Sequence, residues 1–175
     1  MDLQRPLPPH PLEALPQAPT MSLTSTDITD GARLDPRHAA AGENISPQLS
    51  WSGAPENTQG YLLSCFDPDA PTPSGYWHWT VVDLDSAITS LEQGEGQSDL
   101  TLPGAGFHLR SDGGEFGYEG AAPPAGDREH RYVFTIHALD VPTLELEPEH
   151  TPTKAHFMGL FHTLARGVIT VTYQL

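Results

Sequence analysis

Apolar residues recur along most of this chain at the spacing of β-strands rather than of helices. Six segments are apolar-polar alternations or apolar runs bounded by turn residues: 21–28, 48–53, 60–67, 78–85, 131–141 and 168–175. Alternation over four to eight residues is typical of a half-buried strand. The run at 60–67 is almost continuously apolar, which indicates a central strand covered on both faces.

One segment, residues 151–167, has the spacing of a helix. Its apolar side chains fall on one helical face: Phe157, Leu160, Phe161 and Leu164. Thr151 or Thr153 can cap its start, and Gly167 provides a natural end. The sequence therefore predicts a helix here, placed at the edge of a domain made mostly of strands.

Composition agrees with a mainly β fold. The chain has 175 residues with 16 Gly and 18 Pro, which argues against a helical bundle and for short strands joined by many turns. This length buries about 70% of its unfolded surface, enough for one core. Residues 1–20 hold six prolines and predict an extended arm, and residues 21–175 predict a single domain of sandwich type.

Charge and cysteine content exclude several functions. With 23 acidic and 8 basic residues the net charge is −15, which disfavours nucleic acid and anionic membranes as partners. Cys65 is the single cysteine, so no disulfide forms within the chain. The start lacks a continuous apolar signal, and no segment approaches a transmembrane span of about 20 residues. A cytoplasmic protein is expected.

Two histidines stand out because each begins a predicted strand after a turn-rich loop. These are His78 and His130, and a rigid sheet below such loops can hold a binding side chain in place. Asp67 and Asp69 flank a proline at the end of the central strand and can orient an imidazole. Protonated imidazoles would bind an anion, whereas neutral ones with a carboxylate would bind a metal. The residues alone leave both chemistries open.

The other candidates are weaker. His156 and His162 lie six apart, not at the i, i+4 spacing of a helical zinc site, and His137 is expected to be structural. A Ser-His-Asp hydrolase lacks the G-x-S-x-G elbow around any serine. Cys65 lies within an apolar run and is expected to be an inert core residue.

Three aromatic residues accompany the histidines. Trp77 and Trp79 would share one face of a regular strand and leave His78 on the other. Tyr132 follows His130 by two residues, so its hydroxyl is expected on the same face as that imidazole.

The chain contains two distinctive motifs, DPDAP followed by HW, and APPAGDREHRYVFTIHALD. Together they resemble the signature regions of the phosphatidylethanolamine-binding protein family, also called Raf-kinase-inhibitor-like proteins. The flanking ITDGARL, ENISPQLSWSG and GYEGAAPP are similar to the prokaryotic branch. The resemblance extends from Ser22 to Leu175 and leaves the proline-rich arm outside it.

The resemblance implies a large central antiparallel Greek-key sheet, a smaller sheet packed on it, and short helices at the edge. It also implies a pocket for phosphate or a phosphoethanolamine head group at the strand ends. Carried onto this sequence, the pocket residues are Asp67, Asp69, Pro71, His78, Ala122, Pro123, His130 and Tyr132. The peptide Ala70–Pro71 is a candidate for the cis form. Ala122 and Trp77 depart from common family residues, and both are expected to narrow the pocket mouth.

The sequence thus predicts a non-enzymatic binding or regulatory protein without cofactor or metal. By resemblance, its partners would be a small phosphate-like anion or phospholipid head group, a kinase or protease, and a second copy in a homodimer. The alternative is a metal-assisted or His/Asp hydrolase of small phosphorylated or ester substrates.

Overall fold

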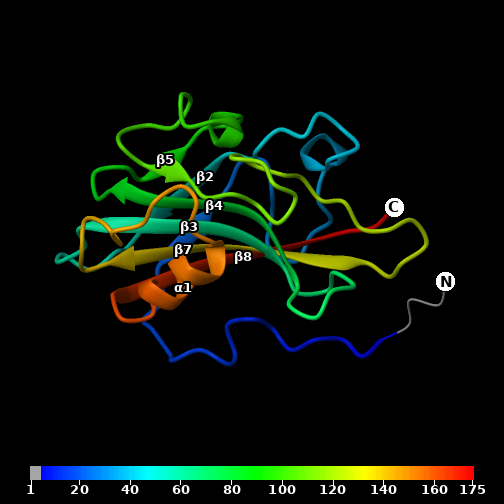
Figure 1. The fold of residues 1–175 in the computed structure, drawn as a ribbon, viewed down its shortest axis with the longest axis horizontal. Coiled ribbons are helices and arrows are strands. Elements are labelled where there is room, and N and C mark those ends of the chain that lie inside the picture. The colour runs from blue at the N-terminus through cyan, green and yellow to red at the C-terminus, as the bar shows by residue number, and fades with distance from the viewer. Residues whose placement is uncertain (1–4) are drawn as a thin grey trace.

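The computed structural model describes residues 5–175, and the first four residues of the predicted arm lie outside this range. Two antiparallel sheets form the fold (Figure 1). The larger has the order β6-β4-β3-β7-β8, made of β3 (Gly60–Asp67), β4 (Tyr76–Asp85), β6 (Phe107–His108), β7 (His130–Leu139) and β8 (Thr163–Tyr173). The smaller has the order β1-β2-β5, made of β1 (Ser22–Thr24), β2 (Leu49–Ser52) and β5 (Ser90–Leu91). The helical elements are α1 (Pro152–Gly159) and two 3₁₀ turns, η1 (Pro36–His38) and η2 (Glu95–Gln97).

The large sheet has Greek-key topology. Strands β3, β4 and β6 lie side by side in that order, and β7 then returns to pair with β3 on its free edge. This is the arrangement in which the fourth strand lies beside the first. The predicted fold, mainly β with a large and a small antiparallel sheet and short peripheral helices, is confirmed.

The main core lies between the two sheets, and a smaller one lies under α1. Leu63 and Phe134 of the large sheet meet Trp51 of the small sheet in the main core, while Leu62 and Ala155 belong to the second cluster. Successive residues of a strand point to opposite faces, so β3 contributes to both cores. The prediction of a strand at 60–67 covered on both faces is correct.

The predicted helix at 151–167 is too long, and its predicted apolar face is wrong. Thr151 does cap α1, through a hydrogen bond from the backbone N–H of Lys154, but the helix ends at Gly159. The side chains of Phe157 and Phe161 are 57% and 69% exposed. The chain from Thr163 onward pairs with β7 instead, because a full ladder beside a buried strand outweighs weak helical periodicity.

The two tryptophans of β4 also lie on opposite faces, contrary to the prediction. A register shift occurs where Cys65 pairs with Trp79 and the next residue, Phe66, pairs with Trp77. His78 is therefore the extra residue of a β-bulge. Trp79 enters the main core, whereas the Trp77 ring packs 4.5 Å from that of Phe66 on the other face.

The described part of the proline-rich segment, residues 5–20, runs along the molecule past α1 (Figure 1). Arginines of the large sheet donate hydrogen bonds to its carbonyls: Arg131 to Pro8 over 2.8 Å, and Arg166 to Pro16 over 2.9 Å. These contacts tie a segment without regular structure to two neighbouring strands.

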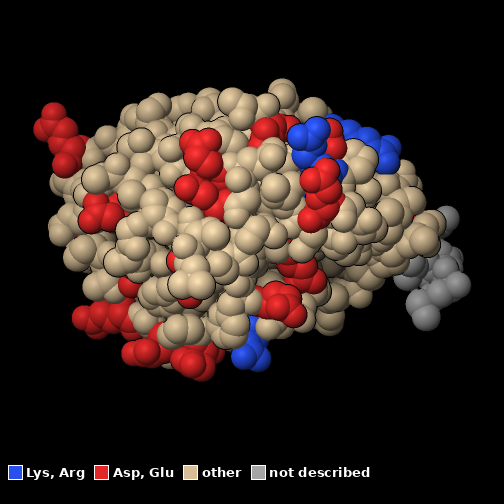
Figure 2. All heavy atoms as spheres, turned by 90° about the horizontal axis from the view of Figure 1, so that it is seen from above, with Lys and Arg blue, Asp and Glu red and all other residues tan. Residues whose placement is uncertain are grey.

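The surface is strongly acidic. Figure 2 shows carboxylates scattered over one face, with a few basic side chains near its edges. Among residues 5–175 no helix has the length and apolar character needed to cross a bilayer.

Candidate functional site

A cavity of about 250 Å³ opens where β3 ends and β4 and β7 begin. β3 and β7 are antiparallel neighbours, so the end of one lies beside the start of the other. This topology brings together residues that are more than sixty positions apart in the sequence. The cavity wall consists of Asp67, Ala70, Pro71, Thr72, Tyr76, His78, Ala122, Pro124 and His130.

His130 lies between two carboxylates. Its Nδ1 is 2.7 Å from Oδ2 of Asp67, and its Nε2 is 3.0 Å from Oδ2 of Asp127. A carboxylate accepts hydrogen bonds, so both ring nitrogens donate and the ring is an imidazolium. Burial alone would lower the pKa of His130, but the hydrogen bonds to Asp67 and Asp127 outweigh it and raise the pKa above its usual range.

His78 is in the opposite state. Its Nδ1 is 3.0 Å from the carbonyl oxygen of Glu119, and a carbonyl can only accept, so Nδ1 carries the proton. Burial lowers the pKa of His78, and the nearby Asp67 and Glu119 offset this only in part. The cavity thus presents one charged and one neutral imidazole.

Behind the cavity, Asp69 is fully buried and braces the loop after β3. Its carboxylate makes a bidentate contact with Arg131, at 2.7 Å to Nε and 2.9 Å to an Nη atom. Asp67 also accepts the backbone N–H of Asp69 over 2.7 Å. The peptide Ala70–Pro71, a candidate for the cis form, is trans.

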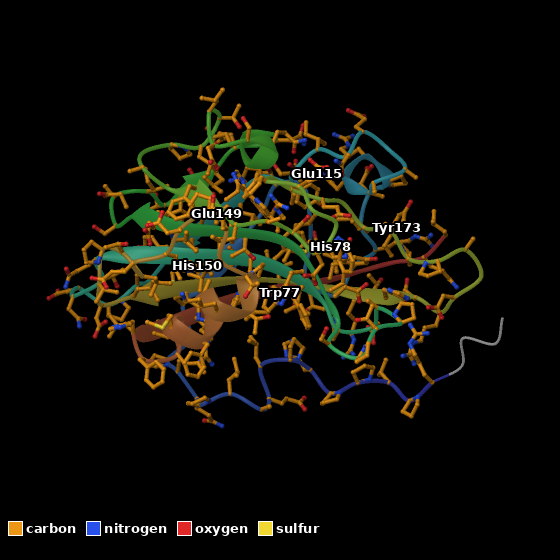
Figure 3. All side chains as sticks on the ribbon, viewed as in Figure 1. Trp77, His78, Glu115, Glu149, His150 and Tyr173 are labelled. Carbon is orange, nitrogen blue, oxygen red and sulfur yellow. The ribbon has the colours of Figure 1, made fainter. Side chains whose placement is uncertain are left out.

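Five of the eight predicted site residues lie on the cavity wall: Asp67, Pro71, His78, Ala122 and His130. Asp69 and Pro123 are absent from it. Tyr132 belongs to the main core, where its ring lies 5.1 Å from that of His78. Trp77, expected at the pocket mouth, does not line the cavity either, because the bulge turns it toward α1, and Figure 3 shows it near that helix.

Among the residues that sequence reasoning missed at this site, three have charged or hydrogen-bonding side chains that the site uses: Tyr76, Asp127 and Arg5. Asp127 precedes His130 by three residues in the GDREH motif, and this spacing was the available signal. Tyr76 donates a hydrogen bond to Glu119 over 3.0 Å, and burial, with the Glu119 charge, raises the pKa of Tyr76 to about 12. Arg5 bonds to Asp127 from the proline-rich arm, a contact between residues 122 apart that no local pattern indicates.

The cavity wall carries neither serine nor cysteine. Cys65 lies in the main core, where burial raises the pKa of its thiol well above the usual value. Within residues 5–175 no three histidine, cysteine or acidic side chains are grouped so as to hold a metal ion. What the wall offers chemically is the His130 imidazolium, paired with the Asp67 carboxylate, next to the neutral ring of His78.

Comparison with known proteins identifies the family. The model of the family described as phosphatidylethanolamine-binding protein matches residues 24–174. This chain belongs to the phosphatidylethanolamine-binding protein family. It is 41% identical over 159 residues to the UPF0098 protein YbhB of Escherichia coli, covering 88% of this chain and 100% of that one. It is 36% identical over 165 residues to the UPF0098 protein YbcL of the same organism, covering 91% and 90%.

Solved structures of this family have the same architecture. The crystal structure of Escherichia coli YbcL, described as a new member of the mammalian family, matches with a TM-score of 0.86 at 35% identity and covers 89% of this chain and 98% of its own. The homologue CT736 from Chlamydia trachomatis matches with a TM-score of 0.76 at 28% identity, covering 90% and 99%. A Plasmodium vivax member, at 16% identity and a TM-score of 0.61, covers 94% and 89% and shares the fold.

Proposed function

We propose that this member of the family is a non-enzymatic binding protein that takes a small phosphate-like anion into the cavity between His78 and His130. The observation that carries the proposal is the His130 imidazolium on the cavity wall. A buried positive charge beside an open cavity is the feature that an anion recognises. By resemblance to the family, an anion bound in this cavity would modulate a protein partner such as a kinase or protease.

The size of the cavity supports a small ligand. Pockets for drug-sized molecules are usually about 300–1,000 Å³, and this one measures about 250 Å³. A phosphoryl group with a short substituent fits this volume, whereas a diacyl lipid would leave its chains outside.

Histidine-ring NMR of the full chain, titrated with O-phosphoethanolamine, tests the proposal. We expect shifts at His130 and His78 and none at His162. The His130→Gln variant should lose binding, whereas the matched His162→Gln variant should keep it. His162 also pairs with a carboxylate, at 2.8 Å from Asp140, but on the surface.

The pH dependence of binding follows from the charge on His130. Its pKa is raised in the folded protein, so the imidazolium persists through the usual histidine range. Affinity should stay high there and fall as pH rises through that raised pKa. Unchanged affinity in His130→Gln would refute the pocket assignment, and turnover of p-nitrophenyl phosphate would contradict a non-enzymatic protein.

A further inference from the structure

The anion position on His130 already holds a carboxylate of the protein itself. The Nε2 atom of His130, a wall residue of the cavity, donates to Oδ2 of Asp127 at 3.0 Å. The Nδ1 atom is engaged with Asp67, so neither N–H of the ring is left for a ligand. An incoming anion can therefore bind the Nε2–H of His130 only by displacing the carboxylate of Asp127. Asp127 lies in the position that such an anion would take.

Asp127 is held in place by the proline-rich arm. The guanidinium of Arg5 donates to both of its oxygens, at 3.0 Å to Oδ1 and 2.8 Å to Oδ2. The same guanidinium contacts the backbone carbonyl of Asp69, and one of its nitrogens lies 3.4 Å from Nε2 of His130. Arg5 and His130 thus place two positive charges around the Asp127 carboxylate, and Asp67 contacts His130 from the other side of the ring. The hydrogen bond to Arg5, with a further one to His130, holds the pKa of Asp127 far below its usual range against the effect of burial.

The arm is itself anchored beside the site. Arg128, the residue after Asp127, donates to the carbonyl of Arg5 over 2.8 Å and to that of Pro6 over 3.1 Å. The loop that carries Asp127 also supplies Ala122 and Pro124 to the cavity wall. Movement of Asp127 would therefore change the cavity and the arm contact together.

We propose that Asp127 is a built-in competitor for the anion position on His130, and that Arg5 makes the emptied position selective for doubly charged phosphate monoesters over singly charged phosphodiesters. This rests on the proposed function of the cavity. A phosphodiester carries one negative charge, like the carboxylate it displaces, so the exchange brings little Coulombic gain. A phosphate monoester carries a charge of about −1.5 to −2 at pH 7, so it brings more negative charge than Asp127 to Arg5 and His130, while Asp67 stays bonded to the other ring nitrogen of His130. A soluble phosphate monoester is therefore expected to bind more tightly than a lipid head group, which is a diester.

Calorimetric titration of the full chain at pH 7.5 with two ligands that share an amine tests both parts. The ligands are O-phosphoethanolamine, a monoester, and sn-glycero-3-phosphoethanolamine, a diester. We expect the wild type to prefer the monoester at least about tenfold. Asp127→Asn should bind both ligands about tenfold more tightly, because the competing carboxylate is gone and both cations remain. Arg5→Gln should lose most of the preference, because one of the two cations is gone.

Matched variants control for net charge. Asp35→Asn and Arg37→Gln make the same charge changes at an exposed ion pair of 3.4 Å, and both should behave as the wild type does. The proposal is overturned if Asp127→Asn leaves the affinities unchanged or weaker, or if Arg5→Gln keeps the monoester preference. In either case anion binding by the wild type would still support the proposed function. If neither the wild type nor Asp127→Asn binds either ligand, both the proposed function of the cavity and the proposed role of Asp127 as a competitor are rejected.

Discussion

Two places in this protein hold buried histidines whose rings differ in charge: the cavity, with His130 at the start of β7, and the contact between β7 and α1, with His137 and His156. At the cavity, His130 contacts two carboxylates and the hydrogen bonds raise its pKa against the effect of burial. Under α1, the rings of His137 and His156 lie 5.3 Å apart, and Trp77 stacks on His156 at 4.4 Å. Burial, with a smaller contribution from the charge of the nearby Arg166, lowers the pKa of His137 well below its usual value and that of His156 to about 3.

The difference shows that burial by itself makes an imidazole neutral. A buried histidine keeps a charge only where the fold supplies carboxylates to compensate for lost solvation. His137 has Thr163 as its Nδ1 partner, and the Nε2 atoms of both His137 and His156 lack a hydrogen-bond partner among residues 5–175. Histidine is therefore a neutral, packed side chain at His137 and His156, whereas His130 is a charged side chain on the cavity wall.

The largest expected contrast is in stability. His130→Leu leaves the carboxylate of Asp67 buried without its imidazolium, and we expect a loss of about 3 kcal/mol in the free energy of unfolding. His137→Leu removes a neutral ring of similar volume and should cost less than about 1.5 kcal/mol. Urea denaturation at pH 7 measures both, and equal losses would erase the distinction between the two groups.

The pH dependence of stability should also separate them. A raised pKa in the folded state means that the His130 contribution is complete below the unfolded pKa of about 6.5 and is lost as pH rises through the folded pKa. A lowered pKa means that His137 and His156 contribute above about 6.5 and lose that contribution as pH falls. Each slope is at most about 1.4 kcal/mol per pH unit per group.

Single-histidine variants assign these slopes. In urea midpoints recorded from pH 4 to 9, His156→Gln should flatten the acid side of the wild-type profile and leave the alkaline side unchanged. His130→Gln should flatten the alkaline side. A His130→Gln profile parallel to that of the wild type above pH 6.5 would mean that His130 is not charged in the folded protein.

The smallest expected effect concerns the tautomer of His137. The Thr163 hydroxyl donates to the carbonyl of Gly159 over 2.7 Å, so it accepts from Nδ1 of His137 at 3.1 Å and holds the proton on that nitrogen. Thr163→Val should lower the free energy of unfolding by about 1 kcal/mol. It should also remove the preference of His137 for the tautomer protonated on Nδ1, which ¹⁵N chemical shifts of the ring would show. Thr24→Val, at an exposed hydroxyl with a bond of 3.4 Å, should change stability by less than about 0.5 kcal/mol. A His137 ring protonated on Nε2 in the wild type would contradict the assignment.

The sequence by itself indicated six of the eight strands among residues 5–175, the mainly β class and, through two motifs, the family, whereas the two-residue strands β5 and β6 were not predicted. Period-two patterning is a local property, and strand burial follows from it directly. The same local patterning places the ends of two strands at Asp67 and His130, and these strand ends indicated the candidate site. Local patterning failed at residues 163–167, where pairing with β7 replaced a helix, and at His78, where a bulge separated Trp77 from Trp79.

Only the tertiary structure decided which imidazole is charged. That depends on Asp127 and Asp67 converging on one ring and on Glu119 presenting a carbonyl to the other. The contact of Arg5 with Asp127 joins residues 122 apart. Electrostatic state is set through space by whatever the fold brings within hydrogen-bond distance, and no spacing along the chain encodes that distance.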